Sequence, residues 1–260
     1  MLYFPQLASG AIGQHPITRN LYQRTVTNVM PDGSRIRYAD PGAPYVEWTL
    51  RYQSLSDTEA GMLDQFFGTC EGRLQPFTFA DPLANLLMWS EDLTQPAWEA
   101  SALLQLATGV ADPNGGLRAI QIKNPTSADL GIQQAVAVPG WYWYTFSVHL
   151  QSQTGISLFR QAGGLTSEKS YCTSNSWQRV SLTGQSNTTA AEVTVGITIR
   201  AGQTVTVYGF QLEPQTAAST YKPSYETGGA YTNAHFSNDT FVITTTAPNR
   251  NQCALGITAR

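Results

Sequence analysis

The sequence is poor in charged residues, and it contains few lysines and cysteines. Asp, Glu, Lys and Arg together make up 13% of the 260 residues, about half the share usual for soluble proteins. Only three lysines occur, and no basic run could neutralise a row of phosphates, so we expect no tight nucleic-acid binding. The three cysteines form no CxxC pair, so both a disulfide framework and a cysteine zinc site fail on count and spacing.

Long apolar runs are also missing. No stretch approaches the roughly 20 apolar residues that span a bilayer, so we expect no membrane insertion. The N-terminal MLYFPQLASG lacks a basic region followed by an apolar one, so we expect no secretory signal and folding in the cytoplasm. Hydrophobic residues nevertheless reach 42% and aromatic residues 11%, which is ample for genuine cores.

No constellation of catalytic or metal-binding residues is visible. The three histidines are far apart, and neither a GxSxG elbow nor a phosphate-binding glycine loop occurs. We therefore predict no enzyme activity, no cofactor and no metal. Glycosidase carboxylates can be distant in sequence, so Glu91, Asp92 and Glu213 stay open as candidates by residue type. Residues 112–115 (Asp-Pro-Asn-Gly) could offer oxygens to calcium, but a plain turn is the stronger interpretation.

The first third of the chain reads as strands with one helix. We expect strands over residues 22–28, 36–40, 46–53 and 74–79, separated by turn sequences. The helix begins at a capping box formed by Ser56 and Glu59, and Gly72 suits its left-handed end. Apolar residues then follow helical spacing along one face: Ala60, Leu63, Phe66, Phe67 and Cys70.

Residues 85–224 contain short strands with turns between them. The expected strands cover residues 133–138, 142–150, 178–183, 192–200 and 204–212. Strict alternation along 142–150 predicts a β-sandwich, with Tyr144 and Phe146 on one face and Trp143 on the other. Two further strands are expected near the end of the chain, over residues 236–246 and 252–258.

The first segment resembles a known family through a series of motifs. Residues 4–85 carry FPQL, GQHP, WTLRYQSLSDTE, LDQFF and FTFADPLANLL. This series resembles the phage distal tail family that is also found in gene transfer agents. The resemblance implies a tail-tube-like β-barrel or sandwich with one packed helix. It also implies a hexameric ring around the DNA channel, with tail tube and tail hub proteins as neighbours.

The second segment resembles the carbohydrate-binding-like jelly rolls of phage tail proteins. Its opening is NLLMWSEDL with Trp98 following, and YTFSV, WQRV, YGFQLE and the closing STYKPS come after. The resemblance implies a jelly-roll β-sandwich, a fold related to carbohydrate-binding modules. It does not imply that sugar binding is retained.

Together these resemblances predict an all-β protein in which one domain is inserted into another. We expect residues 1–84 and 225–260 to form the ring-forming domain, and residues 85–224 to form the inserted jelly roll. The alternative is that 225–260 is a separate interaction tail. The predicted function is a structural distal tail or baseplate protein of the virion tail tip, assembled in the host cytoplasm. It would pass DNA without binding it specifically and display the jelly roll for decoration or for contact with a host-surface glycan. A stand-alone glycan-binding adhesin and a tail-associated glycosidase are the alternatives.

Two sets of residues are candidates for contacts. Trp141 and Trp143 could form an aromatic platform for a glycan, or could instead pack against the other domain or a neighbouring subunit. The segment from Phe4 to Leu21 could bridge ring subunits, or could instead cover the core of its own subunit. Its apolar residues are Phe4, Leu7, Ile12 and Ile17.

Overall fold

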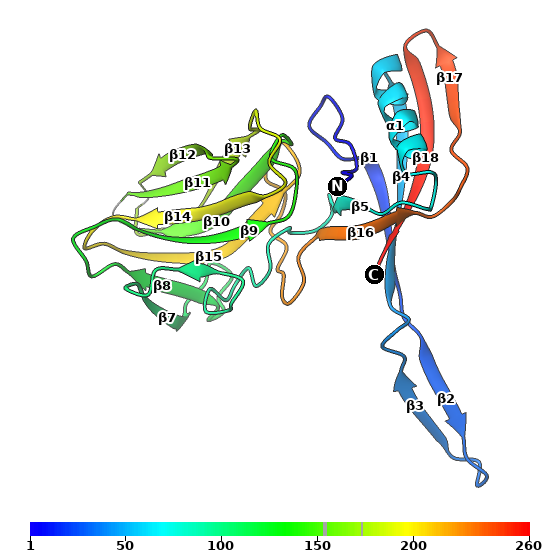
Figure 1. The fold of residues 1–260 in the computed structure, drawn as a ribbon. Coiled ribbons are helices and arrows are strands. Elements are labelled where there is room, and N and C mark those ends of the chain that lie inside the picture. The colour runs from blue at the N-terminus through cyan, green and yellow to red at the C-terminus, as the bar shows by residue number, and fades with distance from the viewer. Residues whose placement is uncertain (153–154, 173) are drawn as a thin grey trace. The chain divides into compact units, whose positions relative to one another are not determined.

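The computed structural model describes residues 1–152, 155–172 and 174–260, which form two compact units (Figure 1). The first unit comprises Met1–Ala8, Gly13–Phe79 and Tyr231–Arg260, and the second comprises Ser9–Ile12 and Ala80–Ala230. These boundaries differ by a few residues from those expected, and Ser9–Ile12 lies with the second unit instead of the first. Both units consist almost wholly of strands and the first contains a helix, so the expected fold class is confirmed.

The first unit is built on a six-stranded sheet with the order β1-β4-β18-β16-β5, in which β17 pairs with β18. Its strands are β1 (Gln14–Tyr22), β4 (Tyr45–Leu55), β5 (Phe77–Ala80), β16 (Ala230–Phe236), β17 (Ile243–Ala247) and β18 (Arg250–Ala259). The two-residue period expected along β4 is present, because Val46, Trp48, Leu50 and Tyr52 are buried while the residues between them are not.

The single helix, α1 (Asp57–Thr69), packs against β4 and β18. Both hydrogen bonds of the expected capping box form: the Glu59 amide donates to Ser56 Oγ, and the Ser56 amide donates to the Glu59 carboxylate. Gly72 adopts φ +64° just beyond the helix, in the left-handed region that glycine tolerates best. The sequence therefore located the start of this helix, whereas at its end Glu71, at φ +52°, already adopts the left-handed region before Gly72.

One strand expected near the C-terminus is interrupted. The sequence pattern predicted a continuous strand over 236–246, but β16 ends at Phe236 and β17 begins at Ile243. The chain leaves the sheet at Ser237, whose amide donates to the carbonyl oxygen of Gly256. Two residues later, Asp239 is held by Arg73 at 2.7 Å. The Ser237 bond is the last one that follows the pairing of β16 with β18, and the Asp239 ion pair holds the segment that comes after it.

A two-stranded ribbon, which we call the β-arm, connects β1 to β4. It consists of β2 (Thr25–Val29) and β3 (Arg35–Ala39), which pair with each other in antiparallel register. In Figure 1 the β-arm extends beyond the end of the six-stranded sheet of its own unit. Its turn is closed by hydrogen bonds between Met30 and Ser34 and between Met30 and Gly33, with Gly33 at φ +83°.

The second unit is a jelly-roll β-sandwich of two antiparallel five-stranded sheets. The first sheet has the order β13-β10-β15-β8-β7 and consists of β7 (Gln105–Val110), β8 (Ala119–Lys123), β10 (Tyr144–Gln151), β13 (Gln178–Gly184) and β15 (Thr204–Glu213). The second has the order β12-β11-β14-β9-β6 and consists of β6 (Glu99–Ala100), β9 (Leu130–Val136), β11 (Ile156–Ala162), β12 (Leu165–Tyr171) and β14 (Val193–Ile199). Buried side chains of alternate residues fill the space between the sheets, among them Tyr144, Phe146, Ile197 and Leu212.

No helix in the described part of the chain is long and apolar enough to cross a membrane.

Candidate functional site

The residues expected to bridge ring subunits are mostly buried within the chain itself. Phe4 is 1% exposed, and its ring contacts those of Phe66, Phe77, Phe79 and Phe236. Leu7 and Ile12 are buried as well, and Ile17 is half-buried. Three of the four side chains are therefore buried within the single chain, and the bridging role of this segment stays a prediction.

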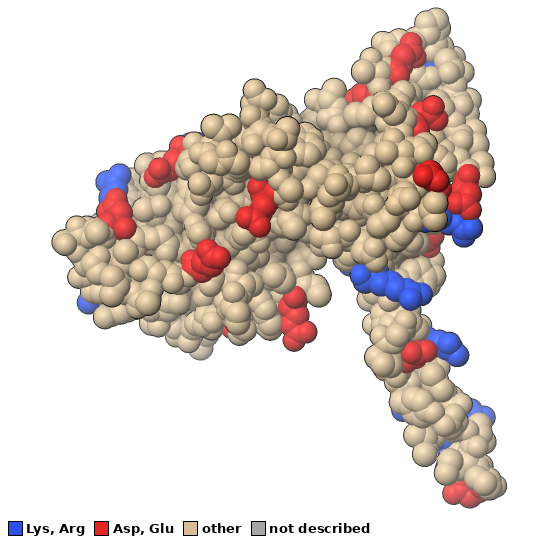
Figure 2. Space-filling view, in the orientation of Figure 1, with Lys and Arg blue, Asp and Glu red and all other residues tan. Residues whose placement is uncertain are grey.

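The β-arm exposes apolar residues that the sequence analysis did not single out. Nine of its ten strand residues are exposed, and the tenth, Val26, is half-buried. Among these, Val29 is 64% exposed, Ile36 50% and Tyr38 45%. Figure 2 shows scattered basic and acidic side chains along the β-arm, with uncharged surface between them. Both faces of this ribbon are thus open, and some of its surface is apolar.

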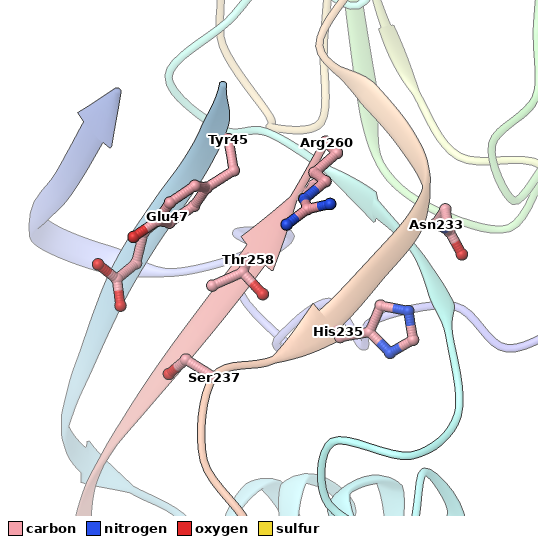
Figure 3. A pocket seen from close by; sticks show the side chains of 8 residues that line it. Tyr45, Glu47, Asn233, His235, Ser237, Thr258 and Arg260 are labelled. Carbon is pink, nitrogen blue, oxygen red and sulfur yellow. The ribbon is translucent and has the colours of Figure 1, made fainter. Parts of the chain in front are cut away.

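In the first unit, the face of the six-stranded sheet that lies away from the hydrophobic core holds a polar depression of about 530 Å³ (Figure 3). Side chains from the adjacent strands β4, β18 and β16 line it, including Glu47, Thr258 and His235. Glu47 accepts a hydrogen bond from the Tyr22 hydroxyl at 2.8 Å, and His235 Nδ1 lies 3.0 Å from the carbonyl oxygen of Arg73. Both side chains therefore already make hydrogen bonds within their own unit.

The two tryptophans expected to form a glycan platform have different surroundings. Trp141 is 40% exposed and lines an open depression with Asn187, Thr188 and Thr189. Trp143 is half-buried, and a Cβ built on Gly10 would lie 3.1 Å from its indole ring. Both precede β10, which begins at Tyr144, because the chain makes a turn in which the Tyr142 amide donates to the carbonyl oxygen of Pro139.

The three carboxylates considered for glycoside hydrolysis are used in structural contacts. Burial alone would raise the pKa of Glu213, but hydrogen bonds from Lys222 and Ser219 outweigh it and lower that pKa. The same balance lowers the pKa of Asp92, whose carboxylate accepts from Thr94 and Gln95. Because a glycosidase acid needs a raised pKa, neither carboxylate is suited to that role. Glu91 accepts hydrogen bonds from Tyr208 and Arg118.

The loop considered for calcium is a turn closed by its own aspartate. Asp112 Oδ1 accepts from the amides of Asn114 and Gly116, and Oδ2 accepts from the amide and side chain of Arg118. Its oxygens are therefore already occupied by N–H donors. No cluster of His, Cys, Asp and Glu able to hold a metal ion occurs within the described ranges.

A further aromatic residue occupies the outer face of the second sheet of the sandwich. Phe159 on β11 pairs with Gly196 on β14, and a Cβ added to Gly196 would lie 2.7 Å from the Phe159 ring. The ring is half-buried, so part of it faces solvent. Across the same sheet, Gly196 pairs with Gln133 on β9, and Gln133 pairs with Glu99 on β6. The Gln133 side-chain amide donates to the Glu99 carboxylate at 3.0 Å. The result is a ring flanked by amide and carboxylate groups on a flat sheet face, which we call the Phe159 face.

Comparison with known proteins gives fold likeness only. No protein-family model matches the chain, and no curated protein matches it. Among solved structures, the C-terminal family 22 carbohydrate-binding module of Clostridium thermocellum Xyn10B is similar at 16% identity and a TM-score of 0.41, covering 54% of this chain and 97% of that one.

Two further solved structures show similar values. A TmCBM61 module in complex with β-1,4-galactotriose is 16% identical with a TM-score of 0.38, covering 49% of this chain and 97% of that one. The enzymatically active domain of bacteriophage CBA120 tailspike protein 4 is 12% identical with a TM-score of 0.41, covering 51% of this chain and 22% of that one. Because these identities and scores are low, the function has to be argued from the chain's own residues.

Proposed function

We propose that this protein is a non-enzymatic structural protein that assembles with copies of itself through the β-arm. The observation that carries the proposal is the exposure of both faces of the β-arm. A two-stranded ribbon is only marginally stable in water, and its unpaired edges invite a partner strand. Contact with a neighbouring copy would cover Val29, Ile36 and Tyr38 and would supply partners for the unpaired edges of the β-arm.

The charges of the first unit favour a second copy as the partner. The β-arm carries Arg35 and Arg37 on β3, whereas α1 carries no basic residue. The exposed residues of α1 include Asp57 and Asp64, and Glu71 follows just after it. A β-arm of one subunit that reached α1 of the next would therefore meet opposite charge. Contacts between two different surfaces of this kind form a ring when the rotation from one subunit to the next closes, and an open filament when it does not.

In its specific form the proposal is a ring subunit of a phage tail tip, of the distal tail or baseplate kind, that lets DNA pass through its channel. Its support is the series of motifs in residues 4–85, the exposed β-arm and the structural use of the candidate carboxylates. The tail tube and tail hub proteins would then lie on either side of the ring.

The proposal is tested by native mass spectrometry and negative-stain imaging of the full chain. Replacing residues 24–43 with Asn-Gly joins β1 to β4 by a two-residue turn and removes the β-arm. Ile36→Asp is a milder change, and Leu117→Asp is its control at a residue that is 68% exposed in the second unit. We expect rings for the wild type and the control and folded monomers for both β-arm variants. Rings that survive both β-arm variants would contradict the proposal.

A second function, glycan binding by the sandwich, is favoured by the Phe159 face. Sugars stack their apolar faces on flat aromatic rings while neighbouring polar groups bond to the hydroxyls. Phe159 supplies the ring, and Gln133 and Glu99 supply the polar groups. The glycine at position 196 lets the ring lie close against the sheet. Trp141 offers a second exposed aromatic side chain outside this face.

Affinity electrophoresis in gels containing neutral polysaccharides tests this function. We expect retardation of the wild type and its loss in Phe159→Ala. Leu165→Ala is the matched control because Leu165 is an apolar residue that is 50% exposed on the neighbouring strand β12. If the gel retarded Phe159→Ala and the control equally, Phe159 would take no part in glycan binding.

A further inference from the structure

A cavity of about 440 Å³ in the second unit combines aromatic and charged side chains away from the Phe159 face. It lies beside β7 and β8, in the sheet of the sandwich that does not carry Phe159. Two segments that are distant in sequence meet there. Its lining includes Trp89, Glu91 and Asp92 from the first segment and Tyr225 from the second, with Arg118 next to β8. The volume falls in the range of small-molecule sites, about 300–1,000 Å³.

The backbone of Trp89 is held in an unfavourable conformation. Its φ of +51° lies in the left-handed region, which a bulky residue rarely adopts and which costs about 1–3 kcal/mol. Three hydrogen bonds hold it there. Its amide donates to the carbonyl oxygen of Tyr225 at 2.8 Å, and its own carbonyl oxygen accepts from Trp98 Nε1 and from the Asp92 amide. The surrounding structure therefore fixes the direction in which the Trp89 indole leaves the chain.

Arg118 is equally well positioned, and one of its donors is unused. Its Nε donates to Asp112 at 3.4 Å, and its Nη1 lies 3.3 Å from both oxygens of Glu91. Its Cζ lies 5.4 Å from the centroid of the Tyr208 ring. The Nη2 atom of Arg118 makes no hydrogen bond to any of the described residues, and the Arg118 side chain is 48% exposed. A fixed guanidinium with an open N–H pair suits a hydroxyl or ring oxygen of a ligand.

The aromatic side chains complete a surface suited to a sugar ring. Trp89 is half-buried, whereas Tyr225 is 62% exposed. Gly109, at φ +76° in a bulge of β7, leaves open space beside them. An indole fixed by its backbone is a rigid, amphipathic contact that loses little entropy on binding.

We propose that this cavity is a second saccharide site, which holds a neutral sugar unit against Trp89 and Tyr225 with hydroxyl groups bonded to Arg118. The inference rests on the proposal that the sandwich binds glycans but assigns a site separate from the Phe159 face. Neutral sugars fit better than acidic ones because the carboxylates of Glu91, Asp92 and Asp112 outnumber the single guanidinium. The sugar hydroxyls can also donate to the carboxylate of Glu91, which is 12% exposed.

The test is ¹⁹F NMR of the full chain labelled with 5-fluorotryptophan. The six tryptophans give separate probes, and Trp89→Phe assigns the Trp89 resonance. Xylohexaose, cellohexaose and maltohexaose serve as neutral ligands, and a galacturonate hexamer serves as the acidic one. We expect a neutral ligand to shift the Trp89 resonance, and the galacturonate hexamer to shift it less at equal concentration.

Variants separate this site from the Phe159 face. Tyr225→Ala should weaken the Trp89 response about ten-fold, while Phe159→Ala should leave it unchanged. Trp89→Asn keeps the left-handed backbone, which asparagine tolerates, so it should fold and lose the same binding in calorimetric titration. If Phe159→Ala abolishes the response, the cavity is not the site although glycan binding stands. If no saccharide shifts the resonance, or only the acidic one does, the inference is overturned.

Discussion

Replacing Gly196 with alanine should destabilise the sandwich through a single methyl group. The new Cβ would stand 2.3 Å from the carbonyl oxygen of Ile132 and 2.9 Å from Cα of Gln133. Both are backbone atoms of β9, so no rotamer change relieves the clash, and β9 and β14 must move apart. Overpacking costs about 1–3 kcal/mol of stability. We expect a loss near the upper limit of this range because the new methyl group would also clash with the Phe159 ring.

For a unit of this size, a loss of about 3 kcal/mol lowers Tm by roughly 6–12 °C. Differential scanning calorimetry of the full chain measures it, and the transition that moves is that of the second unit. Gly131→Ala on β9 is the matched control, because its Cβ would come no closer than 3.7 Å, to the carbonyl oxygen of Ile197. Equal losses in the two variants, or an unchanged Tm for Gly196→Ala, would refute the reasoning from close approach.

Four further perturbations test other parts of the structure. Phe4→Ala should destabilise the first unit by about 3–5 kcal/mol in chemical denaturation, because the ring is fully buried among aromatic neighbours. Lys222→Met should cost about 3 kcal/mol at pH 7, since it strands the buried Glu213 carboxylate, and the difference should shrink as the pH falls below about 4.5 and that group is protonated. Burial and, next, Arg179 lower the pKa of His149, so stability should fall as the pH drops below about 6.5, and His149→Gln should reduce that slope. In a thiol-titration assay of the folded protein Cys172 should react first, because the two other cysteines are buried and their pKa values are raised to about 11.

Local signals in the sequence predicted the helix and five of the ten strands of the sandwich, whereas β6, β7, β8, β11 and β12 were not expected. The capping box at Ser56 and the glycine at position 72 act within a few residues, so they can be read without the tertiary structure. The strand β1 was not expected, because Gln14–Tyr22 has weak alternation and pairs only with the distant β4. The gap between β16 and β17 was missed for a similar reason, since Asp239 within it is held by Arg73, which is distant in sequence.

The candidate sites were harder to predict than the fold. Phe159 did leave a signal, because it stands out of phase with the buried Ile156 and Leu158 and so had to point outward. The Trp89 cavity left none, since it forms only when the fold brings Tyr225, about 136 positions away, to the backbone amide of Trp89. Likewise, the role of Glu213 as a buried anchor depends on Lys222 and Ser219, which the fold brings to it.

The short segment Ser9–Ile12 has a consequence for how such a protein can change. It belongs to the unit otherwise formed by Ala80–Ala230, and its Gly10 lies against Trp143. A recombination event that exchanged only residues 80–230 would bring in a sandwich without these four residues. The incoming sandwich would have to pack against the Gly10 that remains in the chain, or the residue that replaces Trp143 would be left uncovered. The sandwich unit is therefore encoded by two separate pieces of sequence, and we expect only exchanges that keep both pieces together to yield a folded chimera.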